Sequence, residues 1–218
     1  MADLRVGLIE SNDLVRAGRA LVFNSQPDMK VVYEEPNGLV ALSKVPDYLV
    51  DVLVVGHKIQ GIESGSYISQ LTKALRVAGN RAAVISMVPF IGDSLRWEVI
   101  SQGAKEIFGL DQSAKELLSK VSKVVSPDYL FPTNELEKLN LSYGPLPRQL
   151  VLDSQISKLT DQQNKFVEMF LAGKTDNEIC KFFDISKQRV SKTFDSLLES
   201  GNFVTRNQLF LYLQGMNS

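Results

Sequence analysis

The sequence predicts an α/β domain followed by a small all-α domain, and three observations carry this prediction. Between residues 4 and 125, five short apolar segments alternate with five longer segments of helical periodicity. Two of the short segments, DVLVV at 51–55 and AAVIS at 82–86, are almost continuously apolar, as in strands of a parallel sheet covered by helices on both faces. From residue 155 onward the pattern predicts helices only.

The first 125 residues predict a flavodoxin-like (βα)5 domain with a parallel sheet. The expected strands are Leu4–Ile9, Met29–Glu34, Asp51–Val55, Arg81–Met87 and Lys105–Phe108. The expected helices are Asn12–Ser25, Asn37–Tyr48, Ser64–Val77, Ile91–Gln102 and Ser113–Val124. In such a sheet, functional side chains gather at the carboxyl ends of the strands. Those ends carry Glu10, Ser11, Gly56, His57, Ser86, Met87, Gly109 and Leu110.

Residues 126–154 predict a linker, because four prolines are spread among polar residues there. At most a short helix is expected near Asn134–Leu139. Residues 155–218 then predict a small domain of four helices. Its first helix is capped by Thr160 and Gln163 and its last helix by Thr205 and Gln208. The last helix is so apolar that Leu209, Phe210, Leu211 and Leu213 are expected either to close the small core or to contact a second copy.

The middle of the helical domain predicts a helix-turn-helix. Residues 175–183 form one expected helix, with Thr175 and Glu178 as its capping box. Residues 184–186 form a tight turn, and Ser186 caps a second helix over 187–200. In this arrangement, the second helix is the one that can enter the DNA major groove.

The second helix has one apolar and one polar face. Val190, Phe194, Leu197 and Leu198 recur at helical spacing and are expected to face inward. The candidate DNA-binding residues on the other side are Lys187, Gln188, Arg189, Ser191, Lys192 and Asp195. Long polar and cationic side chains are the groups that contact phosphates and base edges. The alternative is the ordinary solvated face of an amphipathic helix.

Composition restricts the partners and the compartment. The net charge is −1, so no overall basicity indicates nucleic acid, and DNA binding is expected to depend on dimerisation. Cys180 is the only cysteine, which excludes an internal disulfide, favours a reducing compartment and is expected in the core. No signal peptide is recognised and no apolar run reaches the ~20 residues of a membrane span. A cytoplasmic protein without membrane contact is expected.

With these motifs, nearly the whole chain resembles a response regulator of the NarL/FixJ type with a LuxR-type output domain. The output motifs are LT at 159–160, Gly173, NEIC at 177–180 and DISKQRVSK at 184–192. The receiver half carries VGLIESNDLVRAG, AVISM and QGAKEIF. Two positions depart from the family pattern in the output half. Gln163 replaces a usual glutamate, and Ser191 replaces a lysine that commonly contacts phosphate.

The receiver half departs from the family at its phosphorylation site. The resemblance implies an aspartate nucleophile after the third strand, where this chain has Gly56. The acid pair that holds a divalent cation is reduced to Glu10 and Ser11, and the lysine position is Leu110. Ser86 matches at the hydroxyl position, so three of the five functional positions are lost. We therefore expect no aspartyl phosphorylation and no bound metal.

The sequence thus predicts a bacterial DNA-binding transcriptional regulator, acting on double-stranded DNA as a homodimer and without a phosphate switch. The degenerate receiver would serve as a platform for dimerisation, for a protein partner or for a small ligand beside His57. No catalytic constellation and no cofactor motif is present, so an enzyme is not expected. The alternative is an adaptor whose helix-turn-helix contacts another regulator or RNA polymerase.

Overall fold

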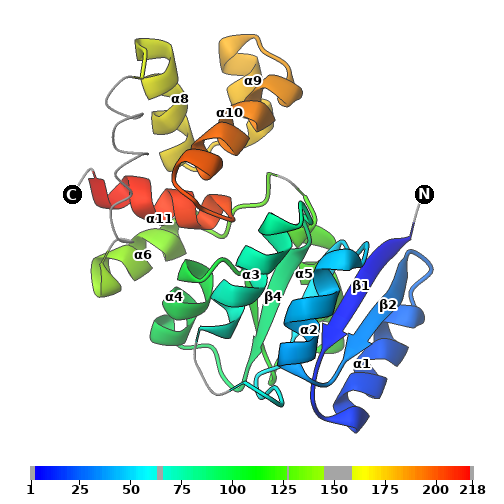
Figure 1. Ribbon diagram of the computed structural model, residues 1–218. Coiled ribbons are helices and arrows are strands. Elements are labelled where there is room, and N and C mark those ends of the chain that lie inside the picture. Colours follow the sequence, from blue (N-terminus) through cyan, green and yellow to red (C-terminus); the bar gives the residue numbers. More distant parts are fainter. Residues whose placement is uncertain (1–2, 63–65, 127, 145–158, 217–218) are drawn as a thin grey trace. The chain divides into compact units, whose positions relative to one another are not determined.

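The chain forms two compact units, Met1–Ser126 and Pro127–Ser218. The computed structural model describes residues 3–62, 66–126, 128–144 and 159–216 (Figure 1). Each unit has its own hydrophobic core and is described by itself.

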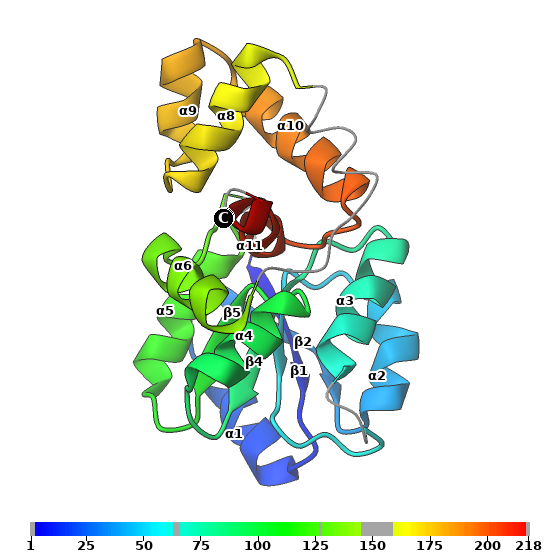
Figure 2. The same cartoon turned by 90° about the vertical axis from the view of Figure 1, so that its left-hand side faces the viewer.

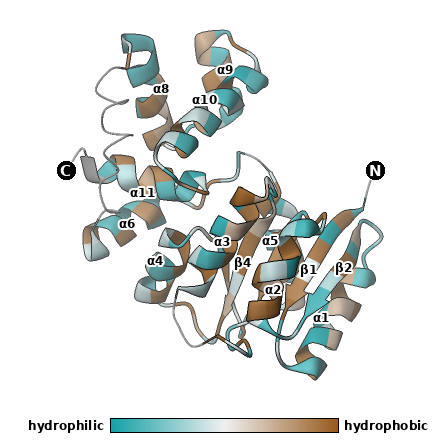
Figure 3. Cartoon of the chain, in the orientation of Figure 1, coloured by the Kyte–Doolittle hydropathy of each residue, from teal (hydrophilic) through white to brown (hydrophobic). Residues whose placement is uncertain are grey.

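The first unit is built on a five-stranded parallel sheet in the order β2-β1-β3-β4-β5. Its strands are β1 (Leu4–Ile9), β2 (Met29–Glu35), β3 (Val52–Val55), β4 (Ala83–Val88) and β5 (Glu106–Gly109). All residues of β3, β4 and β5 are buried. Figure 3 shows the corresponding hydrophobic colour along β4. The predicted flavodoxin-like α/β fold is confirmed.

In the part of this unit that the structure describes, four α-helices connect consecutive strands and a fifth follows the last strand. They are α1 (Asp13–Asn24), α2 (Gly38–Lys44), α3 (Tyr67–Val77), α4 (Asp93–Ser101) and α5 (Ala114–Val124). Figure 2 shows α2 and α3 on one side of the sheet and α5 on the other. The apolar strands are therefore covered on both faces, which explains why they do not alternate with polar residues.

One predicted helix of this unit is shorter than expected. The pattern predicted a helix over 37–48, but α2 ends at Lys44 and the 3-10 turn η1 (Val45–Asp47) follows. Pro46 explains the difference, since proline restricts the residue before it and has no amide hydrogen to continue an α-helix.

The second unit is entirely helical among its described residues. Its helices are α6 (Thr133–Tyr143), α8 (Asp161–Leu171), α9 (Asp176–Phe183), α10 (Lys187–Ser200) and α11 (Arg206–Met216). Four phenylalanine rings form a chain through its core, in the order Phe166, Phe194, Phe170 and Phe210, with centroids 4.8–5.7 Å apart. Such tilted and edge-on pairs are favourable beyond the area they bury.

Helix α6 lies in the stretch expected to be a linker. It is longer than the short helix expected there, and it packs on α11. Leu136 and Leu139 are buried, and Asn140 Nδ2 donates to the Leu211 carbonyl over 2.7 Å. The structure therefore groups residues 128–144 with the helical unit. The rest of the expected linker, up to residue 154, lies outside the described residues.

The last helix is in the core. Leu209, Phe210, Leu211 and Leu213 are all buried within the chain. They close the core, so the alternative that they are free to contact a second copy is wrong. None of the helices in the described ranges is both long and apolar enough to cross a bilayer.

Candidate nucleic-acid interface and carboxyl-edge pocket

The helix-turn-helix is formed by α9, a tight turn and α10, with the caps that the sequence predicts. The Thr175 hydroxyl accepts from the Glu178 amide at 3.3 Å, and the Glu178 carboxylate accepts from the Thr175 amide at 2.8 Å. Asp184 closes α9 in the left-handed conformation (φ 52°), and the Ser186 hydroxyl accepts from the Arg189 amide to start α10. Local sequence therefore fixes both ends of the turn.

The Glu178 carboxylate is held in its ionised form. Hydrogen bonds from the Thr175 amide, the Lys174 ammonium and the Thr175 hydroxyl lower the pKa of Glu178 to about 2. A charged Glu178 also lies in the first turn of α9, where the helix dipole favours a negative charge.

The orientation of α10 presents most of the expected polar residues to solvent. Val190, Phe194 and Leu197 are buried, as predicted. On the opposite side, the exposed residues are Lys187, Gln188, Arg189 and Lys192, while Ser191 and Asp195 are only half-buried. Cys180, which the sequence places in the core, is half-buried.

A buried ion pair fixes the start of α9 to the start of α11. The Arg206 guanidinium contacts the Asp176 carboxylate in a bidentate manner, at 2.6 and 3.1 Å, and both side chains are buried. The same guanidinium lies 3.7 Å from the centre of the Phe194 ring on α10. A single arginine therefore connects three helices of the unit. Sequence analysis missed this contact.

Two further polar residues lie beside the expected cations on α10. A cavity of about 300 Å³ between α8 and α10 is lined by Arg189, Lys192, Thr193, Ser196 and Gln163, together with apolar residues. Thr193 and Ser196 follow Arg189 at i+4 and i+7, so helical spacing alone could have found them.

At the carboxyl edge of the first unit, Glu10 is neutralised by an arginine of the same chain. Its Oε2 accepts from Arg19 Nη1 at 2.5 Å, and both side chains are nearly buried. Its Oε1 accepts from the Asn12 amide at 3.0 Å. Arg16, one turn before Arg19 on α1, donates to the Glu10 carbonyl at 2.7 Å. The carboxylate that the family would offer to a divalent cation is thus occupied by an internal cation.

Glu10 also fills the space beside Gly56. A Cβ placed on Gly56 would lie 2.6 Å from Glu10 Oε2 and 3.0 Å from its Cδ. Contacts this short force a neighbour to move, and Glu10 is tied to Arg19. Position 56 therefore accommodates a glycine while Glu10 is paired with Arg19, whereas a Cβ would force a neighbour to move.

The six predicted residues of the degenerate receiver pocket are not all brought together. Gly56, His57 and Ser86 line one cavity. Ser11 instead connects two loops, since its hydroxyl donates to the Pro36 carbonyl and accepts from the Gln60 amide. The Leu110 side chain is half exposed and does not line the cavity. Arg16 and Arg19 were missed, although their i,i+3 spacing after Glu10 places them on one face of α1.

The cavity at this edge has a volume of about 360 Å³ and lies between α3 and α4. Most of its lining is apolar. The residues with polar side-chain groups that line it are His57, Lys58, Tyr67, Ser86, Glu98 and Gln102.

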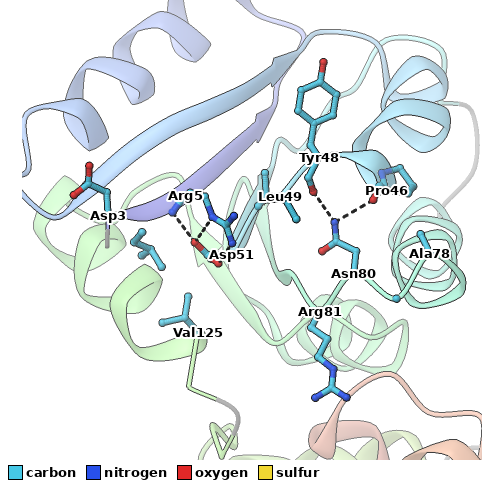
Figure 4. A pocket seen from close by; sticks show the side chains of 13 residues that line it. Asp3, Arg5, Pro46, Tyr48, Leu49, Asp51, Ala78, Asn80, Arg81 and Val125 are labelled. Atoms are coloured by element: carbon cyan, nitrogen blue, oxygen red, sulfur yellow. Dashed lines mark hydrogen bonds and ion pairs between the residues drawn. The ribbon is translucent and has the colours of Figure 1, made fainter. Parts of the chain in front are cut away.

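The cleft at the amino edge of the sheet is larger, about 970 Å³, and is drawn in Figure 4. Arg5 and Asp51 pair with each other there, with Arg5 Nη2 2.8 Å from Asp51 Oδ1, and this contact lowers the pKa of Asp51. Asn80 donates to the Tyr48 carbonyl at 2.8 Å. These polar groups already satisfy one another, so the cleft offers little to a ligand. In the described ranges, no group of three His, Cys, Asp or Glu residues could hold a metal ion.

The fold and the two sites define a class of protein: a receiver-like α/β unit followed by a helix-turn-helix unit. No model of a known protein family matches the sequence. The response regulator protein VraR of Staphylococcus aureus is 20% identical over 209 residues, which cover 96% of this chain and 95% of that protein. The transcriptional regulatory protein LiaR of Bacillus subtilis is 21% identical over 214 residues, covering 96% of each chain.

Solved structures show the same fold. The response regulator RcsB of Salmonella typhimurium, studied for its conformational dynamism in DNA interaction, superposes with a TM-score of 0.53 at 15% identity, over 98% of this chain and 99% of that one. The receiver domain of the response regulator NarL from Mycobacterium tuberculosis gives a TM-score of 0.51 at 20% identity, over 57% of this chain and 98% of that domain. The relatives by sequence and by fold are thus response regulators of the NarL/LuxR group.

Proposed function

We propose that this protein is a bacterial, cytoplasmic DNA-binding transcriptional regulator that acts without aspartyl phosphorylation. The observation that carries the proposal is α10, a capped helix with Lys187, Gln188, Arg189 and Lys192 exposed on one side and a buried face on the other. The relatedness to VraR and LiaR over both units supports the same function.

In this proposal, α10 enters the major groove. Gln188 and Arg189 on its first turn contact base edges, since amide and guanidinium groups are the usual readers of adenine and guanine. The DNA backbone is contacted by Lys187 and Lys192. Ser191 and Asp195 contact it as well or adjust the position of the helix. No metal, cofactor or catalytic residue is part of the proposal.

The absence of a phosphate switch is supported by the chemistry of the carboxyl edge. Gly56 has no side chain to phosphorylate, and Glu10 is paired with Arg19 rather than open to a cation. Leu110 supplies no ammonium group to stabilise a phosphoryl product. The receiver-like unit then acts as a platform for a second copy, a protein partner or a small ligand.

Homodimerisation follows from the weak charge of the unit that contacts DNA, because two half-sites increase the number of phosphate contacts. Helix α1 offers an apolar surface for such contact. Leu14 and Leu21 are 83% and 72% exposed and lie seven residues apart, on one side of the helix. Exposed leucines that share one face of a helix form the kind of apolar patch that a second surface can cover.

Footprinting of the purified protein on genomic fragments tests the proposal. If Arg189 reads a base, we expect Arg189→Ala to cost about 1–3 kcal/mol of binding free energy at one base position. Lys192→Ala should weaken binding to all sequences about equally, and it should reduce by about 1 the slope of log affinity against log salt concentration. Lys165→Ala is the matched control, because Lys165 lies on α8 and pairs with Glu168 at 2.7 Å. A protein without any sequence preference at modest salt would contradict the proposal.

A second candidate function is an adaptor whose helix-turn-helix contacts another regulator or RNA polymerase. The observation that favours it is Phe182, which is 59% exposed at the end of α9. A large exposed aromatic side chain is more typical of a protein interface than of a phosphate contact. A pull-down that survives nuclease and Arg189→Ala, but is lost with Phe182→Ala, would favour the adaptor.

A further inference from the structure

The cavity between α3 and α4 is lined by polar atoms for which the described residues supply no hydrogen-bond partner. Ser86 is only 6% exposed, and its hydroxyl makes no hydrogen bond to any of the described residues. The Gln102 side-chain oxygen is buried and has no partner in the same part of the chain. Buried polar groups are nearly always hydrogen-bonded, so the Gln102 oxygen indicates that a further molecule supplies its bond, and the Ser86 hydroxyl in the same lining is available to that molecule.

The rest of the lining selects an apolar molecule. Ile59, Ile62, Ile68, Met87, Leu95 and Val99 form most of the remaining wall. The charged groups, Lys58 and Glu98, belong to exposed residues and are of opposite sign. The carboxylate of Glu10, which could have attracted a cation nearby, is already paired with Arg19. Neither a phosphate nor a metal ion fits this lining, because a charge inside it would lose its hydration without gaining a counter-charge.

We propose that this cavity binds a small uncharged, mainly apolar ring compound that carries one hydroxyl or N–H group. Its volume of about 360 Å³ is at the lower end of ligand sites, which suits one or two rings. The ligand donates its hydrogen bond to Gln102 Oε1 or shares it with the Ser86 hydroxyl, while its rings contact the isoleucines. Ser86, which keeps the family's hydroxyl, thus serves a ligand rather than a phosphoryl group.

Binding would connect two helices. Tyr67 and Ile68 of α3 contribute to one wall, and Leu95, Glu98 and Val99 of α4 contribute to the other. A ligand bound between them holds α3 and α4 at one separation. In the proposal, this binding replaces phosphorylation as the signal. This last step rests on the proposed function, whereas the binding site does not.

Calorimetry on the full chain with indole and phenol tests the site. We expect both to bind, and we expect benzofuran, which matches indole in shape but lacks the N–H, to bind about three- to tenfold more weakly, the usual effect of one hydrogen bond. Gln102→Leu should reduce this difference between indole and benzofuran. Equal affinity of indole and benzofuran, or no binding of indole and phenol, would overturn the proposal.

Two tryptophan variants locate the site. Val99→Trp places a large ring in the cavity and should abolish indole binding. Val77→Trp is the matched control, since Val77 is exposed on α3 outside the cavity, and it should bind indole as the wild type does. If Val99→Trp does not fold, Ile68→Phe serves instead, with loss of indole affinity as the expected result. Indole binding that is unchanged in a folded cavity variant contradicts the site.

The signalling step has a separate readout. Saturating indole should change the affinity of the wild type for its DNA site at least threefold, while the same concentration of indole should leave the DNA affinity of Val99→Trp as it is without ligand. Calorimetric binding with unchanged DNA affinity would retain the site and overturn the signal. Failure of DNA binding both with and without indole would overturn the proposed function and leave the calorimetric test unaffected.

Discussion

At the scale of single residues, the carboxyl edge depends on one contact that the sequence pattern did not reveal. The loss of the aspartate at Gly56 and of the lysine at Leu110 could be read directly from the sequence. The pairing of Glu10 with Arg19 could not, because an arginine two turns into a helix has many rotamers and several carboxylates within reach. The structure adds that Glu10 takes the space of a side chain at position 56.

Gly56→Asp should therefore fail to create a phosphorylation site. The new Cβ would lie 2.6 Å from Glu10 Oε2, and its carboxylate would add a second negative charge beside Glu10. After incubation with acetyl phosphate and Mg²⁺, mass spectrometry should find no phosphoryl adduct on the variant or on the wild type. An adduct stable enough to detect in the receiver-like unit of either protein would refute this account of the site.

At the scale of elements, local signals were reliable where a side chain caps a helix. The capping boxes at Ser113, Thr160 and Thr175 are all present. Prediction failed where the deciding contact is distant in sequence. Helix α6 is stabilised by α11, about 70 residues away, and residues 126–144 alone have only a weak pattern. The Asp176–Arg206 pair, 30 residues apart, was missed for the same reason.

Asp176→Asn should strongly destabilise the helical unit. The substitution leaves the buried Arg206 guanidinium without its counter-charge, which costs about 3–5 kcal/mol for a buried pair. Glu168→Gln breaks the exposed pair with Lys165 and should cost at most about 1 kcal/mol. Calorimetric unfolding of both variants measures the difference. Equal unfolding temperatures for the two would show that the buried pair is not important for stability.

The capping box of α9 should make stability depend on pH. The pKa of Glu178 is lowered from 4.5 to about 2 in the folded state, so the unfolded chain takes up its proton first as the pH falls. The stabilisation from Glu178 is complete above about pH 4.5 and is lost between pH 4.5 and 2. Urea midpoints at pH 6, 4 and 3 should fall less for Glu178→Gln than for the wild type. Urea midpoints that fall equally with pH in Glu178→Gln and in the wild type would contradict this role.

At the scale of the whole molecule, an α/β unit and a helix-turn-helix unit occur in one chain, and the first unit has Gly56 and Leu110 where the resemblance implies an aspartate and a lysine. The five βα units and the presence of both domains followed from hydrophobic periodicity, which is strong for the fully buried strands β3, β4 and β5 and for capped helices. The signal that acts on the first unit could not be read from the sequence. The cavity that we assign to it is formed by residues from β3, β4, α3 and α4, which only the fold brings together.

The central claim is that α10 reads DNA in a dimer without a phosphate signal. Selection of bound fragments from a random DNA pool, with the unphosphorylated full chain, tests it most directly. The account predicts enrichment of a two-part sequence whose half-sites are centred about 10 base pairs or a multiple apart, and loss of that enrichment with Arg189→Ala. A pool that stays random with the wild-type protein, or that enriches the same sequence with Arg189→Ala and Lys192→Ala, would contradict it.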